Sequence, residues 1–159
     1  MKSSTLANLS TWMRSYIIDL CTDVPQEQLW ERFEHINAPG WTLMHLVVEG
    51  EMALQKLDVN YTPILLVQDD FESCSSGNAT STITLPQMLD HFTSVYHQLA
   101  TATLAQEDHL ANTPISDEEL KYVLRTELDF YTHMLTTHLA MHTDALMKWR
   151  LKVGLGSPY

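Results

Sequence analysis

Apolar side chains recur at intervals of three and four residues along four stretches of this chain, and that period is typical of amphipathic α-helices. No stretch with the two-residue period of a half-buried strand competes with them convincingly. The first predicted helix runs from about Thr5 to Cys21, and the second runs from about Thr42 to Leu57. The third runs from Leu85 to about Gln106, and the fourth and longest runs from Asp117 to Lys152.

Helix-breaking and helix-capping residues mark the ends of these segments. Thr22–Pro25 ends the first helix, Gln26–Phe33 is compatible with a short connecting helix, and Asn37–Gly40 interrupts the chain before the second helix. Asn112–Pro114 separates the third helix from the fourth. Ser116 is followed by three acidic residues and is the predicted N-cap of the fourth helix, because the helix dipole favours negative charge in the first turn.

The residues between Asp58 and Leu85 show no helical period and include a proline, an acidic pair and a serine-rich run. A connection of this length is unusual inside a compact domain and is typical of disordered segments or functional sites. Four amphipathic helices with one long crossover between the second and the third predict an all-α four-helix bundle. Because the 159 residues contain no internal repeat and no dividing linker, residues 1–159 are expected to form a single domain.

The charge balance narrows the candidate partners. With 20 acidic and 9 basic residues the net charge is −11, so neither nucleic acid nor an anionic membrane surface is expected as a partner. The longest aliphatic run, Ile64–Val67, is far shorter than the ~20 residues that span a bilayer. Cys21 and Cys74 lack metal-binding spacing, and two free thiols are a simpler interpretation than one disulfide. Without a signal-type segment, the protein is predicted to be cytoplasmic.

Histidines occupy the inward face of the fourth predicted helix. His138 and His142 are one helical turn apart, so their side chains project from the same face and can bind one ion. A third histidine, His45, lies in the second helix, and three imidazoles that converge inside a bundle would form a divalent-metal site. The other predicted inward positions of the fourth helix are Leu120, Leu124, Glu127, Tyr131, Met134, Met141 and Ala145.

This spacing also has a purely structural interpretation. With eight histidines in the chain, an accidental pair four residues apart is expected in roughly a third of shuffled sequences. His138 and His142 are equally compatible with core residues that bond a glutamate or a backbone group, since an unpaired buried imidazole costs about 1–3 kcal/mol. Tyr131 is expected in the core. His133 lies five residues before His138 and points roughly 140° away, so it is expected at the surface or an interface.

Two segments carry a pattern that extends beyond the histidines. They are Asn37-Ala38-Pro39-Gly40-Trp41-Thr42-Leu43-Met44-His45-Leu46 and His138-Leu139-Ala140-Met141-His142-Thr143-Asp144-Ala145-Leu146, the latter followed by Lys148-Trp149-Arg150. With the amphipathic third helix between them, nearly the whole chain resembles the DinB/YfiT-like metal-binding four-helix bundles. The resemblance implies a divalent metal held by His45, His138 and His142, and a homodimer as a common assembly. Relatives often have arginine or leucine, then glycine and glutamine, after the last histidine, so the support around His142 is expected to differ here.

A three-histidine site leaves coordination positions open, as catalytic metal sites do, and zinc, nickel and ferrous iron all suit imidazole. Because the family includes thiol-dependent transferases and isomerases, we expect metal-assisted thiol transfer or hydrolysis of a small-molecule substrate, with a low-molecular-weight thiol as candidate co-substrate. The pocket is expected in the bundle core, covered by the connection between Asp58 and Leu85. Glu49, one turn after His45, either orients an imidazole or handles a proton, or is a solvated helix residue.

A second hypothesis belongs to a different class of protein. The chain is then a dimeric, stress-associated binding protein whose metal is structural, vestigial or absent. The two hypotheses differ in the expected effect of His142→Ala. An enzyme loses turnover while the fold survives, whereas a binding module shows no turnover with any thiol and keeps its ligand affinity.

Overall fold

The computed structural model describes residues 3–64, 69–72 and 75–159. Every secondary-structure element in these residues is a helix, and none is a strand. The all-α prediction is therefore confirmed for the described part of the chain. The helices are α1 (Ser3–Thr22), η1 (Gln26–Gln28, a 3-10 helix), α2 (Pro39–Leu57), η2 (Asp69–Phe71, a 3-10 helix), α3 (Leu85–Ala105), α4 (Glu107–Asn112), α5 (Glu127–Leu135) and α6 (Thr137–Val153).

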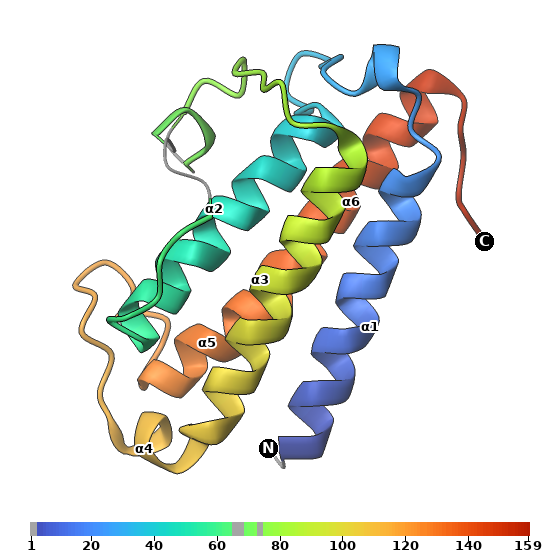
Figure 1. Cartoon of the computed structure of the whole chain (residues 1–159). Helices are drawn as coiled ribbons and strands as arrows, with labels where there is room; N and C mark the ends of the chain where they lie inside the picture. The colour runs from blue at the N-terminus through green and yellow to red at the C-terminus, as the bar shows by residue number, and fades with distance from the viewer. Residues whose placement is uncertain (1–2, 65–68, 73–74) are drawn as a thin grey trace.

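The four longest helices lie alongside one another (Figure 1). α2 packs against α3 and α6, and α1 packs against the same two helices from the other side. In Figure 1, α1 and α6 run upward while α2 and α3 run downward. Because α2 and α3 run in the same direction, the residues between Leu57 and Leu85 join opposite ends of the molecule.

Apolar residues on the facing sides of these helices form the core. The closest packing is between α2 and α3, where a Cβ atom on Gly50 would lie only 2.7 Å from Val95 Cγ1, so glycine permits the close approach. Thr84 and Gln87 form a capping box at the start of α3, and Pro86 occupies its first turn. Core side chains with no exposed surface include Ile17, Leu20, Leu29, Leu43, Leu46, Val47, Met88, Phe92, Val95, Tyr96, Leu99, Leu135, Leu139 and Trp149.

The predicted positions of the first three helices agree with the structure, with small shifts at the ends. α2 begins at Pro39, three residues before the predicted Thr42, because Pro39 occupies its first turn. The short helix predicted over Gln26–Phe33 is wrong in extent, since only η1 forms there. The chain after it makes a turn in which the backbones of Phe33 and Ile36 bond each other in both directions.

The single helix predicted from Asp117 to Lys152 is wrong. Turns and irregular backbone lead from Thr113 to Thr126, and α5 begins at Glu127 with Thr126 as its N-cap. The Thr126 hydroxyl accepts a hydrogen bond from the Asp129 N–H, and the Asp129 side chain bonds the Thr126 N–H in return. Ser116 does not cap a helix, because its N–H and hydroxyl both donate to the carboxylate of Glu127 instead.

A second departure is the break between α5 and α6 at Thr136, whose φ of −135° and ψ of −77° are not helical. Its hydroxyl donates to the Thr132 carbonyl at 2.6 Å, a contact by which threonine bends or interrupts helices. The break changes which residues face the core afterwards. Met141, a predicted inward position, is 65% exposed, whereas Leu139 and Leu146 are buried.

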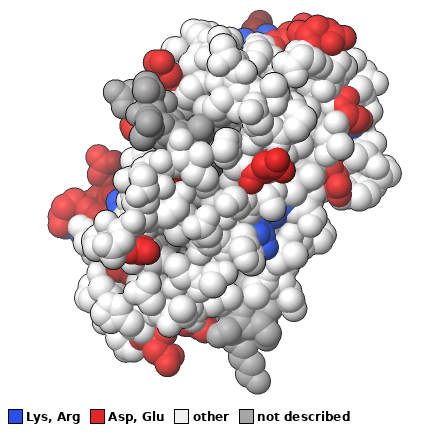
Figure 2. Space-filling model, viewed as in Figure 1, with Lys and Arg blue, Asp and Glu red and all other residues white. Residues whose placement is uncertain are grey.

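Three further predictions concern membrane-spanning helices, the two cysteines and the charge of the surface. No helix among the described residues is both long and apolar enough to cross a membrane. Cys21 is free and buried, and burial raises the pKa of its thiol to about 12, while Cys74 lies outside the described residues. Figure 2 shows acidic side chains spread over the visible face, where the basic side chains of the described residues form no continuous patch.

Candidate metal centre

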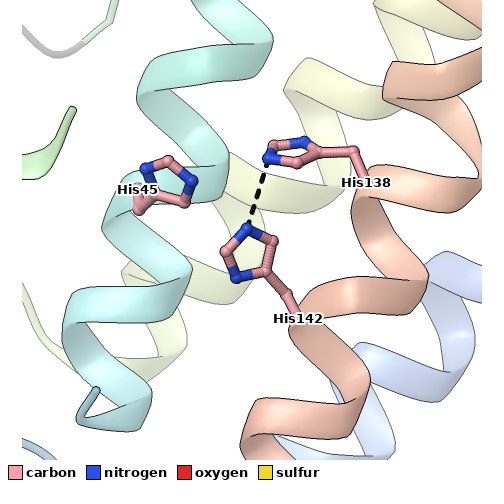
Figure 3. A group of neighbouring side chains, drawn as sticks. All are labelled: His45, His138 and His142. Carbon is pink, nitrogen blue, oxygen red and sulfur yellow. Dashed lines mark hydrogen bonds between the residues drawn. The ribbon is translucent and has the colours of Figure 1, made fainter. Parts of the chain in front are cut away.

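Three histidines predicted as metal ligands lie together between α2 and α6 (Figure 3). His45 comes from the second turn of α2, and His138 and His142 come from the first two turns of α6. One ring nitrogen from each residue can be chosen so that all three lie within 4.8 Å of one another. His45 and His138 are buried and His142 is half-buried, so the cluster lies inside the packed helices.

The spacing within the α6 pair fits two ligands of one ion. The Nε2 atoms of His138 and His142 lie 3.2 Å apart. Metal–nitrogen bonds of about 2.0–2.1 Å at a tetrahedral angle place two ligand nitrogens about 3.3 Å apart. The same separation allows one neutral ring to donate an N–H to the other. Figure 3 shows these two ring nitrogens facing each other, joined by the dashed line.

His45 is oriented by its surroundings on two sides. Its Nδ1 atom lies 2.7 Å from the Phe71 carbonyl oxygen, and because a carbonyl only accepts, Nδ1 carries the proton and Nε2 keeps a lone pair. The ring of Trp41 stacks on the imidazole with centroids 5.0 Å apart, and the Trp41 indole donates to the Asp70 carbonyl at 3.2 Å. The Asp69–Phe71 segment therefore holds His45 in the tautomer and orientation that a metal ligand needs.

Burial keeps the three imidazoles neutral. The pKa of His138 is lowered from 6.5 to about 4 and that of His142 to about 3, with burial as the largest cause and the neighbouring imidazoles as the next. Burial also lowers the pKa of His45, against the opposing effects of the Phe71 carbonyl and Glu49. Since only a neutral imidazole offers a lone pair to a metal, the cluster is in its ligand form at neutral pH. The donor set therefore fits a divalent ion.

Glu49, the candidate proton-handling residue, lies at the edge of the cluster. Its carboxylate oxygen is 3.9 Å from Nδ1 of His45, and its side chain is 21% exposed. The Phe71 carbonyl is closer to that nitrogen, so the carboxylate is not the main orienting group for His45. The role of Glu49 in proton transfer stays a prediction.

His133, expected at the surface or an interface, borders the surface but lies closer to His138 than its spacing in an unbroken helix predicts. The break at Thr136 brings its ring to a centroid distance of 5.7 Å from the ring of His138, and its side chain is half-buried. Nδ1 of His133 lies 2.6 Å from the hydroxyl oxygen of Thr137. The ring also borders a surface hollow of about 400 Å³ formed by the end of the 113–126 segment and α5. Tyr131, by contrast, is in the core as predicted.

Sequence reasoning missed the groups that orient His45. Trp41 lies four residues before His45 on the same helix, so the spacing used for the α6 pair could have identified it. The Phe71 carbonyl is a backbone group in the irregular connection and leaves no signature in the sequence. The expected cover over the site corresponds, in the described residues, to η2 packed against α2.

Comparisons of this chain with protein-family models, with curated proteins and with solved structures found no match. The geometry of the three histidines therefore carries the functional argument, and the resemblance to the DinB/YfiT-like bundles stays a prediction.

Proposed function

We propose that this chain binds one divalent metal ion through Nε2 of His45, His138 and His142 and is a metal-dependent enzyme of the DinB-like type. Its proposed reaction is thiol transfer to a small molecule or hydrolysis of one. The observation that carries the proposal is the convergence of three neutral imidazoles from two helices, with the Nε2 atoms of the α6 pair 3.2 Å apart. The separation fits two ligands of one ion, and the nearby ring of His45 can supply the third ligand nitrogen.

The three residues supply three neutral ligands, which is the number found in catalytic rather than closed structural sites. A bound divalent ion would act as a Lewis acid that lowers the pKa of a coordinated thiol or water. His45, held by the Phe71 carbonyl and the Trp41 ring, presents its lone pair without rearrangement. We propose that Glu49, whose side chain is 21% exposed and whose carboxylate lies 3.9 Å from Nδ1 of His45, accepts a proton from the incoming nucleophile.

The arrangement of the helices supports the DinB-like assignment. We propose that α1, α2, α3 and the α5–α6 pair form a single-domain four-helix bundle with an up-down-down-up order and one crossover between α2 and α3. The shared direction of α2 and α3 in Figure 1 favours this topology. The assembly as a homodimer, the cytoplasmic location and a low-molecular-weight thiol as co-substrate belong to the same proposal, and so does the choice among zinc, nickel and iron.

Elemental analysis of untagged protein tests the metal site directly. We expect about one equivalent of a transition metal per native chain, and its loss in His138→Ala. His97→Ala is the matched control, since it removes an exposed imidazole from α3 and should leave the metal content unchanged. Native protein that is metal-free and takes up neither zinc, nickel nor iron would contradict the proposal.

Turnover then separates an enzyme from a binding protein. With metal-loaded protein and a panel of small thiols and hydrolysable esters and amides, the enzyme hypothesis predicts activity that disappears in His142→Ala while the helical circular dichroism remains. Metal binding without turnover, combined with loss of the fold in His142→Ala, would instead support a structural metal.

A further inference from the structure

The geometry points to His133 as a positioning residue for the metal ligand His138: its imidazole accepts the Nδ1–H of His138 when Nε2 of His138 binds the metal. This inference rests on the metal site proposed above. It assigns a role to a fourth histidine that lies outside the three-histidine cluster.

The first observation is an unpartnered nitrogen. Nδ1 of His138 is buried and has no hydrogen-bond partner among the described residues, while Nε2 of the same ring faces His142. When Nε2 donates its lone pair to a metal, the proton of the neutral ring must sit on Nδ1. Metal-bound histidines almost always donate that second N–H to a carboxylate, a carbonyl or water. His138 therefore needs an acceptor on its Nδ1 side.

The second observation is the identity of the neighbouring ring. Among the described residues, the imidazole of His138 makes ring contacts with His45, His142 and His133. His45 and His142 are proposed to bind the metal through Nε2. Nδ1 of His45 also donates a hydrogen bond to the Phe71 carbonyl. The ring of His133 lies at a centroid distance of 5.7 Å and an angle of 40° from the ring of His138. Of the three neighbouring rings, it is the one that is not a proposed metal ligand.

The third observation concerns the tautomer of His133. The Thr137 hydroxyl oxygen lies 2.6 Å from Nδ1 of His133 and 3.5 Å from the His133 carbonyl oxygen. In the tautomer that the inference requires, the hydroxyl donates to that carbonyl and accepts from Nδ1–H. The proton of the His133 ring then sits on Nδ1, and Nε2 has a free lone pair. With that tautomer, His133 accepts the N–H of His138 without changing its own charge once the two rings, which are neighbours but not hydrogen-bonded in this structure, move together.

The helix break at Thr136 makes this contact feasible. In an unbroken helix, residues five apart point roughly 140° away from each other and their rings would not meet. The non-helical backbone at Thr136 separates α5 from α6 and turns the end of α5 so that the two rings pack together. Because His133 borders an open surface hollow, its replacement leaves no closed cavity in the core.

The test compares His133→Ala and His133→Gln with the native full-length chain. Apparent zinc dissociation constants are measured at slightly alkaline pH by competition with a chromophoric chelator. We expect His133→Ala to bind zinc about 10- to 100-fold more weakly, and His133→Gln, whose amide oxygen can accept the same N–H, to stay within about threefold of the native value. His97→Ala serves as the control for removal of an imidazole elsewhere.

A second readout separates positioning from general packing. In zinc-loaded protein, the Nδ1 proton of His138 should give a protected imidazole N–H signal in nitrogen-15 magnetic resonance. The signal should exchange much faster in His133→Ala and persist in His133→Gln and His97→Ala. Zinc affinity and exchange that are the same in His133→Ala as in the native chain would overturn the inference and leave the proposed metal site intact. A native chain that binds no metal would overturn both.

Discussion

At the scale of single residues, the charge state of the clustered imidazoles determines how the protein responds to acid. In the metal-free protein the folded-state pKa is about 4 for His138 and about 3 for His142, against 6.5 in an unfolded chain. Below about pH 6.5 the unfolded state therefore binds more protons, and stability falls as the pH decreases toward the folded-state values. We expect the free energy of unfolding of chelator-treated protein to drop by roughly 1–3 kcal/mol between about pH 7.5 and about pH 5.5, as measured by urea unfolding.

The same experiment on variants identifies the titrating groups. His142→Gln removes one half-buried imidazole with a lowered pKa and should make the pH dependence shallower. His97→Gln, which changes an exposed residue, should leave the slope unchanged. A native metal-free chain that is equally stable at both pH values would show that these rings can be protonated in the folded state.

The sequence predicted which three histidines form the cluster, but it did not predict the groups that orient their rings. The four-residue spacing placed His138 and His142 on one face, and this was correct because α6 is a regular helix over both residues. His45 was a third candidate because it lies in the second predicted helix, and the family resemblance supported its role as a ligand, since no local pattern relates two helices. His133 was misplaced because its predicted direction assumed an unbroken helix. The Phe71 carbonyl was beyond prediction, because every residue has a backbone carbonyl and only the path of the chain selects one.

At the scale of helices, the start of α5 offers a direct comparison between two candidate N-caps. Thr126 makes both bonds of a capping box with Asp129, whereas Ser116, the cap expected from the sequence, bonds the side chain of Glu127. We expect Thr126→Ala to lower the free energy of unfolding by about 0.5–2 kcal/mol. Ser116→Ala should change it by less than about 0.5 kcal/mol, because its hydroxyl bond is exposed. Urea titrations of the two variants measure the difference, and a larger loss in Ser116→Ala would contradict the observed helix boundary.

The error over residues 117–152 has an identifiable physical cause. Ser116 with three following acidic residues satisfies the local rule for a helix start, and the apolar period continues through the segment. Yet Leu120 and Leu124, the predicted inward positions of this part, are only half-buried, and the backbone around them forms turns instead of a helix. The break at Thr136 is accompanied by a hydrogen bond from its hydroxyl to the Thr132 carbonyl. The spacing of apolar residues cannot predict such a bond. Periodicity predicted that helices exist, and local polar contacts determined where they begin and end.

At the scale of the whole molecule, side chains from the last turns of α6 form hydrogen bonds that join several segments at the end of the bundle opposite the N-terminus. The Trp149 indole donates to the Glu31 carbonyl at 2.6 Å, which ties α6 to the segment between η1 and α2. Arg150 is 1% exposed and donates to the Asp23 carboxylate and to the carbonyls of Leu20 and Gly156. These bonds join the end of α1, the end of α6 and the C-terminal segment. They fix the end of α6 against the end of α1 and the segment before α2, whereas the histidine cluster lies in the first two turns of α6.

Replacement of Arg150 tests this role at a distance from the metal site. Arg150→Met keeps much of the side-chain volume but leaves the buried Leu20 carbonyl and the Gly156 carbonyl without this donor, so we expect the free energy of unfolding to fall by about 1–3 kcal/mol. Lys148→Met is the control, because its ion pair with Asp144 is exposed and should contribute less than about 0.5 kcal/mol. Arg150 lies two turns beyond His142, so the stoichiometry of zinc binding at low temperature should stay that of the native chain. Loss of zinc binding in a variant that keeps its helical circular dichroism would show that the position of the histidines on α6 depends on Arg150. Unchanged stability would show that the buried guanidinium is dispensable.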